Sequence, residues 1–246
     1  VYDDASRMVQ LFYPSFPTIA FFTNVYDTLG RVSRQTDANG NPWDFYFAGS
    51  RSETIDAAGN RHVTYQTPRG QVIKDARVLD AGYGEVFNDT AQQNDVVNVA
   101  SSQYDGQDRL ILATAPEGGT VGYTYSLDLK HNVIAVTQTP KSGSGLSVRV
   151  TNTAYDPIFS KPTTITDPLG RVTQMRYDTS TGNLLSVLAD AGGFNARSSF
   201  TYSGLGQVLT ATDPLGTVTL NTYDAKGNVI EVTRDTGRLN QITRMD

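Results

Sequence analysis

Few side chains in this sequence have the types and spacing that catalysis or metal binding requires. The 246 residues include no cysteine and only two histidines, His62 and His131, each beside a predicted turn. A catalytic nucleophile needs a positioned base beside it, and a three-histidine zinc site needs one histidine more. Neither Gly-x-Ser-x-Gly nor His-Glu-x-x-His occurs. We therefore predict no enzyme activity, no metal site and no cofactor, and we interpret both histidines as solvated.

Acidic residues offer two further kinds of chemistry. Residues 37–41 (Asp-Ala-Asn-Gly-Asn) are similar to a calcium loop, because carboxylate and amide oxygens suit a hard cation. The glycine stands at the fourth position instead of the sixth, and no glutamate closes the loop, so a plain Asx turn is favoured over calcium. Asp27, Asp178 and Asp224 could form an acid–base pair, but they occupy equivalent positions of different repeats. We interpret these carboxylates as structural.

Aromatic side chains give the strongest candidate for ligand contact. Trp43, the only tryptophan, lies in a turn-rich segment with Phe45 and Tyr46. Exposed aromatic rings can stack on sugar rings, so these three residues are the best candidates for contact with a carbohydrate or a peptide. The alternative is that they pack within the protein, as we expect of the tyrosines that recur at a fixed position, which would form a ladder between repeats.

Charge and hydropathy exclude several classes of protein. Twenty Lys and Arg residues against 25 Asp and Glu residues give a net charge of −5, and no basic block occurs. This balance argues against a nucleic-acid partner and against binding to anionic membranes. The longest apolar stretch, Ile19–Phe22 with the nearby segment 11–13, is too short and too broken to span a bilayer. With 10% aromatic and only 18% charged residues, the chain should fold.

A repeat of about 21 residues runs through the sequence. One of its two signatures, Tyr-Asp-x-x-Gly followed by a polar and an apolar residue, is clearest at residues 26–32 and recurs at 223–229. It also recurs at 177–184, with one extra residue before the glycine. The second, Asp-x-x-Gly, alternates with the first at residues 37–40, 56–59, 167–170 and 213–216. The tyrosines at positions 155, 177, 202 and 223 are 22, 25 and 21 residues apart. A fixed period with two alternating signals predicts a repeat architecture.

Both signatures are turn signals with a physical basis. The Asp side chain can accept a bond from the backbone two residues on, and Gly can take the left-handed conformation that closes the turn. Between the turns apolar and polar residues alternate, as in residues 216–223, where Val218 and Leu220 point to one face. No sustained helical periodicity occurs. Each period is therefore one β-hairpin, and neighbouring hairpins supply the core that a single hairpin lacks.

Three stretches interrupt the repeat. Residues 11–22, aromatic and punctuated by proline, favour an inward loop or plug over a strand pair. Residues 88–98 are polar and predict an exposed insertion, and residues 141–145 (Lys-Ser-Gly-Ser-Gly) predict a flexible hairpin tip. Because the repeat resumes after each of them, we predict a single domain over residues 1–246. The chain opens inside a repeat unit at Val1, so we expect it to be part of a longer protein.

The two signatures resemble the YD repeat of the Rhs family, most clearly over residues 23–75 and 155–235. That family includes bacterial Rhs polymorphic toxins, the B and C components of insecticidal toxin complexes, and teneurins. The resemblance implies an all-β fold, in which stacked antiparallel hairpins form a spiralling, curved sheet that is an open segment of a hollow shell. The residues that would shape its repeat turns are Tyr26, Asp27, Gly30, Arg31, Tyr177, Asp178, Gly182, Tyr223, Asp224, Gly227, Asp167, Gly170, Asp213 and Gly216.

The toxin members of the family end their shell with a self-cleaving motif built around Asp-Pro-x-Gly and further glycines. Here the two Asp-Pro-Leu-Gly segments, 167–170 and 213–216, continue as ordinary strands, so we interpret them as repeat turns. This leaves no autoprotease motif in the sequence.

The resemblance implies a structural function. We expect a shell segment of a secreted or cell-surface bacterial Rhs-type protein, with the rest of the same shell and an enclosed toxin or effector as partners. The main alternative is a carbohydrate-binding or adhesion module that uses Trp43, Phe45 and Tyr46 and takes a cell-surface glycan. A third, enzymatic interpretation would need a pair of carboxylates within about 10 Å of each other.

Overall fold

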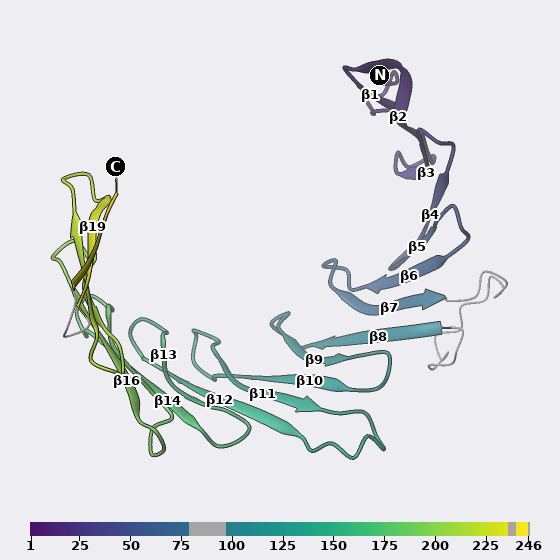
Figure 1. Ribbon diagram of the computed structural model, residues 1–246. Coiled ribbons are helices and arrows are strands. Elements are labelled where there is room, and N and C mark those ends of the chain that lie inside the picture. Colours follow the sequence, from purple (N-terminus) through teal and green to yellow (C-terminus); the bar gives the residue numbers. More distant parts are fainter. Residues whose placement is uncertain (79–96, 236–239, 246) are drawn as a thin grey trace. The chain divides into compact units, whose positions relative to one another are not determined.

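The protein is built from β-strands joined by short turns (Figure 1). The computed structural model describes residues 1–78, 97–235 and 240–245. Its strands are β1 (Gln10–Tyr13), β2 (Phe16–Tyr26), β3 (Val32–Asp37), β4 (Pro42–Ala48), β5 (Arg51–Ile55), β6 (Arg61–Gln66), β7 (Val72–Val78), β8 (Val97–Tyr104), β9 (Leu110–Thr114), β10 (Thr120–Tyr125), β11 (Val133–Thr139), β12 (Arg149–Tyr155), β13 (Pro162–Thr166), β14 (Val172–Tyr177), β15 (Leu184–Ala189), β16 (Ala196–Tyr202), β17 (Val208–Thr212), β18 (Val218–Tyr223), β19 (Val229–Asp235) and β20 (Asn240–Arg244).

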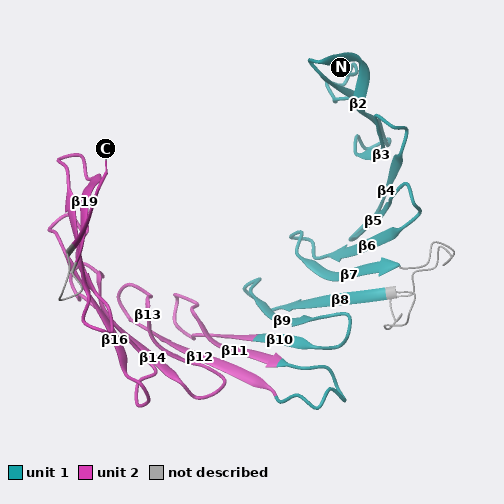
Figure 2. Ribbon diagram, in the orientation of Figure 1, with its two compact units in different colours: residues 1–122, 139–147 teal, residues 123–138, 148–246 magenta. Residues whose placement is uncertain are grey.

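The chain divides into two compact units (Figure 2). Unit 1 comprises Val1–Gly122 and Thr139–Ser147, and unit 2 comprises Tyr123–Gln138 and Val148–Asp246. In unit 1, each strand from β1 to β9 pairs antiparallel with the next. In unit 2, the strands from β12 to β20 do the same. The predicted all-β class of stacked antiparallel hairpins is therefore confirmed, whereas the single domain stays a prediction.

In each unit the turns lie alternately at the two ends of the strands, so each unit has two rows of turns, one along either edge, and the two edges differ. At the edge where the repeat tyrosines lie, the strand register shifts by one residue beside the tyrosine, as at Tyr177, Tyr202 and Tyr223. At the other edge the register runs unbroken into the turn, as in the pairing of Ile165 with Thr173. We call these the tyrosine edge and the plain edge. A bulge bends its strand and increases the local twist, so the hairpins with this shift carry the same bend at one end. The pairing of β4 with β5 has no such shift.

Glycine closes most of the turns in a left-handed conformation. Gly170 has a φ of +79°, and no atom lies within 4 Å of the position that a Cβ would take. Strain in the backbone, and not a clash, is thus the reason for glycine at this position.

Gly170→Ala is expected to lower the free energy of unfolding by about 1 kcal/mol, the penalty of a Cβ in the left-handed region. Gly204 provides the matched control, because it also has open space around it but no positive φ. Gly204→Ala should be neutral or slightly stabilising, since it restricts only the unfolded chain. Urea unfolding of both variants checks the prediction. Equal losses in the two variants would contradict it.

The buried apolar core is small. Among the described residues, Val63, Ala76 and Val78 are the buried hydrophobic side chains, with Tyr65 and Val99 packed against them. Val63 lies opposite Ala76 in the pairing of β6 with β7, so both side chains share one face of the sheet. Most other strand residues are half-buried. The sheet is therefore held together more by its ladders and edges than by a thick core.

The prediction for residues 11–22 was wrong. These residues form strands, because β1 pairs with β2 from Gln10 opposite Thr23 to Tyr13 opposite Phe16. The register shifts twice within this pair. Tyr13 and Phe21 pack with ring centroids 4.7 Å apart. Residues 11–22, which the sequence pattern predicted to be a loop, thus form an irregular strand pair with aromatic contacts between its strands.

The structure describes one of the other two irregular segments, residues 141–145, and only the end of the other, residues 88–98. Of the predicted insertion at 88–98, residues 88–96 lie outside the described residues, and residues 97 and 98 begin β8. Residues 141–145 lie in the connection between β11 and β12, where a hairpin tip was predicted. The described residues contain no helix long and apolar enough to cross a membrane.

Candidate functional site

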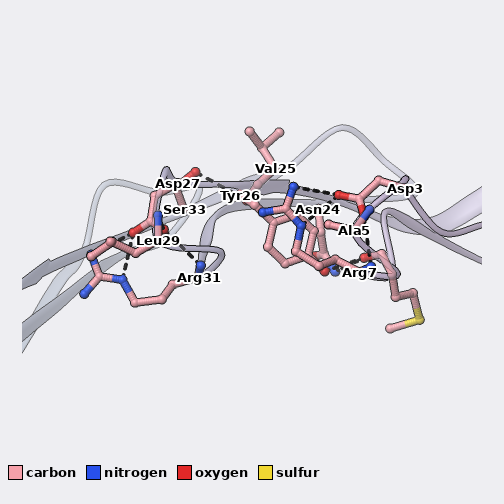
Figure 3. Close-up of polar contacts among 11 residues, drawn as sticks. Asp3, Ala5, Arg7, Asn24, Val25, Tyr26, Asp27, Leu29, Arg31 and Ser33 are labelled. Carbon is pink, nitrogen blue, oxygen red and sulfur yellow. Dashed lines mark hydrogen bonds and ion pairs between the residues drawn. The ribbon is translucent and has the colours of Figure 1, made fainter.

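A five-residue clamp occurs in most turns, and the turn at Asp27 shows its parts (Figure 3). One carboxylate oxygen, Oδ1, accepts the backbone N–H groups of Leu29 and Arg31, both at 2.9 Å. The other, Oδ2, accepts the side-chain Nε–H of Arg31 at 2.8 Å. The N–H of Gly30 donates to the Asp27 carbonyl, and the N–H of Asp27 donates to the Arg31 carbonyl. The turn thus satisfies its own polar groups.

The side chains of the first and fifth residues of the clamp are complementary, because one donates a hydrogen bond and the other accepts it. Where the first is Asp, an acceptor, the fifth is a donor: Arg7, Arg31, Arg109 and Arg171, or Asn41, Asn60 and Asn228. Where the first is a hydroxyl residue, the fifth is Gln, and the hydroxyl donates to its Oε1, as in the pairs Thr67–Gln71 and Ser203–Gln207. In these turns the first residue is the donor and the fifth is the acceptor, the reverse of the Asp turns. The side-chain bond between the two positions is therefore retained.

Bonding within the turns lowers the pKa of their carboxylates. For Asp27, the backbone N–H of Arg31 stabilises the ionised form most and holds the pKa below its ordinary value of 3.8. For Asp178, the Ser180 hydroxyl is the largest cause, followed by the backbone N–H and hydroxyl of Thr181. The carboxylate oxygens are occupied by protein donors, which leaves them poorly suited to metal binding or proton transfer.

The same reasoning applies to the calcium-like segment 37–41. Asp37 accepts bonds from the backbone N–H groups of Asn39 and Asn41 and from the Asn41 amide. This is the geometry of an Asx turn. Across the described ranges 1–78, 97–235 and 240–245, no group of three or more acidic or histidine side chains is arranged to hold a metal ion.

The repeat tyrosines tie each hairpin to the one before it. Their hydroxyl groups donate to the carbonyl of the residue that directly follows the preceding turn on the same edge. Figure 3 shows the first such bond, where Tyr26 lies between the turns at Asp3 and Asp27. The bonds are Tyr26 to Met8 (2.6 Å), Tyr104 to Val72 (3.2 Å), Tyr155 to Val133 (2.9 Å), Tyr177 to Pro162 (2.9 Å), Tyr202 to Leu184 (2.9 Å) and Tyr223 to Val208 (2.8 Å). We call these bonds tyrosine staples.

Turns on the tyrosine edge also contact their next neighbour directly. In unit 1, the Gln71 amide donates to the Asp108 carbonyl at 2.8 Å. In unit 2, the Lys161 ammonium donates to the Gly182 carbonyl at 2.6 Å and lies over the rings of Phe159 and Tyr177. A Cβ on Gly182 would come within 3.1 Å of the Phe159 ring. Close packing therefore adds to the positive φ as a reason for glycine there.

Removing the hydroxyl from two staples is expected to weaken unit 2. The variant Tyr202→Phe/Tyr223→Phe keeps both rings but removes two hydroxyl donors, so the free energy of unfolding should fall by about 1 kcal/mol per hydroxyl. The Val208 carbonyl keeps the Asn221 side-chain amide as a donor. Tyr13→Phe is the control, because Tyr13 is half-exposed and packs through its ring. Chemical unfolding of the three proteins measures the difference. A double variant as stable as the parent would exclude a stabilising role for the staples.

The predicted ligand residues do not all lie together. Successive side chains of a strand point to opposite faces, so Trp43 and Phe45 share one face of β4 with Phe47, and Tyr46 lies on the other. A groove of about 530 Å³ is lined by Val25, Asp27, Arg31, Ser33, Arg34, Asp44, Phe45, Tyr46 and Phe47. Trp43 is exposed but does not line it. The Arg31 guanidinium lies 4.5 Å from the centre of the Phe47 ring.

A buried ion cluster in unit 1 was missed by sequence reasoning. Glu53 in β5 pairs with Arg51 of its own strand and with Arg61 Nε in β6, the latter at 3.0 Å. Its side chain is only 9% exposed, and those of the two arginines are 23% and 18% exposed. Only the strand register brings these residues together, because Glu53 lies opposite Val63.

Comparison with known proteins matches one segment of the chain to a family. Residues 202–239 match the model of the RHS repeat family. The matched segment begins at the staple residue Tyr202, includes Tyr223, and covers the turns at Ser203, Asp213 and Asp224. No curated protein matches the chain.

Several solved structures are similar to the chain at low sequence identity. The crystal structure of TcdB2-TccC3-TEV is 15% identical, with a TM-score of 0.47 over 91% of this chain and 15% of that chain. That of TcdB2-TccC3 is 12% identical, with a TM-score of 0.39 over 100% and 19%. A porin-like protein from Bacteroides uniformis is 14% identical, with a TM-score of 0.34 over 82% and 91%. The chain thus spans less than a fifth of the TcdB2-TccC3 chains.

The family match covers two staples and three turns, and the same staples and clamps recur through the described residues before it. Residues 202–239 therefore carry an RHS repeat, in agreement with the resemblance of the two turn signatures to the Rhs/YD-repeat family.

Proposed function

We propose that the chain is a wall segment of a YD-repeat shell, in a secreted or surface Rhs-type protein of a bacterium that encloses or presents a toxin or effector. The rest of the shell and the passenger are its partners, and no residue need be catalytic. The RHS repeat at residues 202–239 supports the architecture, although family likeness alone does not fix function.

The series of tyrosine staples is the observation that carries this proposal. A wall around a passenger must not separate between its hairpins, and each staple joins a hairpin to its predecessor in addition to the strand ladder. In the clamps, the turn carboxylates accept hydrogen bonds from their own turns, so they too stabilise the protein's structure. Among the described residues, no buried side-chain nitrogen or oxygen lacks a partner. Buried polar groups that are all bonded within the protein are typical of a structural wall, whereas an active centre needs groups that are available to a substrate.

Protease protection tests the shell directly. The polypeptide that carries this sequence in its source organism is purified, its intact mass and sequence are determined, and it is digested with a non-specific protease. A segment outside the repeats that is protected while the shell is folded, and cut after the Tyr202→Phe/Tyr223→Phe change or mild denaturant, would support the proposal. A passenger cut equally fast in every sample, or a polypeptide with no segment outside the repeats, would overturn it.

A second candidate function is saccharide binding at the groove beside β4. The observation that favours it is the combination of exposed rings with two ion pairs, Asp27–Arg31 and Arg34–Asp44, in one groove. Sugars present apolar faces that stack on rings and hydroxyl groups that bond with such planar charged groups. Adhesion to a cell-surface glycan would follow.

The groove is tested on a glycan array and by calorimetry with any saccharide that binds. Tyr46→Ala should then abolish binding with the fold intact, and Trp43→Ala tests the contribution of the neighbouring exposed ring. If no saccharide binds, or if Tyr46→Ala binds as the parent does, the groove is not a glycan site. The shell proposal is unaffected by that result.

A further inference from the structure

Three neighbouring turns on the plain edge of unit 2 carry large apolar side chains in solvent. The turn between β13 and β14 exposes Leu169, that between β15 and β16 exposes Phe194, and that between β17 and β18 exposes Leu215. Their exposed fractions are 79%, 94% and 92%. Such exposure contributes nothing to the fold, because a turn of this type accepts a polar residue at the same place, as Lys226 shows. We call these three residues the apolar row.

The backbone of the apolar row is held firmly. The N–H groups of Leu169 and Leu215 donate to the Asp167 and Asp213 carboxylates, both at 2.9 Å. The N–H of Phe194 donates to the Asp190 carboxylate at 3.0 Å. In each turn an aspartate thus fixes the backbone of the residue whose apolar side chain points outward. A residue whose backbone is already fixed loses less freedom when it enters an interface.

Strand pairing places the three turns on one line. The strands from β13 to β18 pair in sequence, so successive turns on this edge are separated by two strands. With neighbouring strands about 4.8 Å apart, the apolar side chains follow one another at intervals of about 10 Å. A partner must offer apolar groups at the same interval, and another YD-repeat edge does so.

The order of the apolar row is symmetric, Leu–Phe–Leu. A second copy related by a two-fold axis beside Phe194 would place Phe194 against Phe194 and Leu169 against Leu215 of the other copy. A two-fold interface requires such a self-complementary surface.

Charge at the two ends of the row is compatible with the same arrangement. Arg171, at the fifth position of the Asp167 turn, is paired with the Asp167 carboxylate. Thr217 holds that position in the Asp213 turn, and the cation near Asp213 is Arg234 of β19. Each end therefore combines a carboxylate with a guanidinium, and the two-fold arrangement brings no unpaired charge against another.

We propose that the apolar row is a self-association surface, through which two copies of this chain form a two-fold dimer along the plain edges of unit 2. This goes beyond the shell function, since it concerns contact between walls. Stable interfaces bury about 1,200–2,000 Å² in total, and three side chains cover much less, so the dimer is weak and depends on concentration.

Cysteine cross-linking tests the geometry, because the natural sequence has no cysteine. Under mild oxidation, Phe194→Cys should form a covalent dimer at least ten times faster than Leu205→Cys. Leu205 is the matched control, since it is 87% exposed at a turn on the tyrosine edge of the same unit. A mixture of Leu169→Cys and Leu215→Cys should give mainly the mixed disulfide. Circular dichroism confirms that each variant is folded.

Sedimentation equilibrium of the 246-residue chain supplies a readout without cysteines. The average mass should rise with concentration, and the triple variant Leu169→Ser/Phe194→Ser/Leu215→Ser should stay monomeric. The proposal fails if the parent chain is monomeric up to about 1 mM, the range of the weakest specific contacts. It also fails if Phe194→Cys cross-links no faster than Leu205→Cys. Preference for like-with-like disulfides between Leu169→Cys copies would exclude the two-fold arrangement.

Discussion

Glu53→Gln is expected to lower the free energy of unfolding by about 2–4 kcal/mol, because it leaves two half-buried guanidinium groups without their counter-ion. Among residues 1–78, 97–235 and 240–245, Glu53 is the carboxylate that pairs with Arg51 and Arg61, and it is the least exposed of the three. It also lies opposite Val63, so the change falls beside the small core. Thermal and urea unfolding of the chain measure the loss.

Glu117→Gln is the matched control for this change. Glu117 lies exposed in the turn between β9 and β10, and its substitution by Gln should alter stability by less than about 0.5 kcal/mol. A triple variant with Met at positions 51 and 61 and Leu at 53 would separate loss of the charge from loss of the ion cluster. Apolar replacement of a whole cluster is often neutral. A Glu53→Gln protein as stable as the parent would show that solvent screens both arginines.

The hairpins were predictable because their signals are local. Asp, the glycine three residues later and the alternation between turns each act within a few residues, and the strands begin and end where these signals stand. Thus β17 and β18 flank the turn at Asp213, and β18 ends at Tyr223 as the repeat requires. In residues 11–22, by contrast, two prolines and a run of aromatic residues obscured the alternation of a strand pair that contains bulges.

The contacts between hairpins were only partly predictable. A fixed tyrosine indicated a ladder between repeats, but the hydroxyl bond to the carbonyl after the preceding turn depends on a bulge that no residue type announces. The paired first and fifth turn residues were a usable signal in the sequence, since Asp occurs mostly with Arg or Asn, at Asp213 with Thr, and Ser or Thr occurs with Gln. The Glu53 cluster joins two strands through their register, so composition and spacing could not reveal it.

Acid is expected to destabilise the fold steeply below about pH 4, through the turn carboxylates together. In the described residues, the pKa of each of ten turn aspartates is lowered from 3.8; these are Asp3, Asp27, Asp37, Asp56, Asp105, Asp128, Asp167, Asp178, Asp213 and Asp224. The folded chain therefore binds fewer protons than the unfolded chain in this range. Stability from these groups is complete above pH 3.8 and falls as the pH drops through the lower folded values.

Melting curves recorded from pH 6 to pH 2 check this expectation, and Asp178→Asn identifies the groups responsible. The Asp178 pKa is lowered furthest, by the Ser180 hydroxyl and then by the Thr181 backbone N–H and hydroxyl, all of which bond to Oδ1. An asparagine oxygen can accept the same bonds but cannot be protonated in this range. The variant should be slightly less stable than the parent at pH 6, and the difference should shrink as the pH falls. A constant difference from pH 6 to pH 2 would show that the Asp178 carboxylate does not contribute to the acid sensitivity.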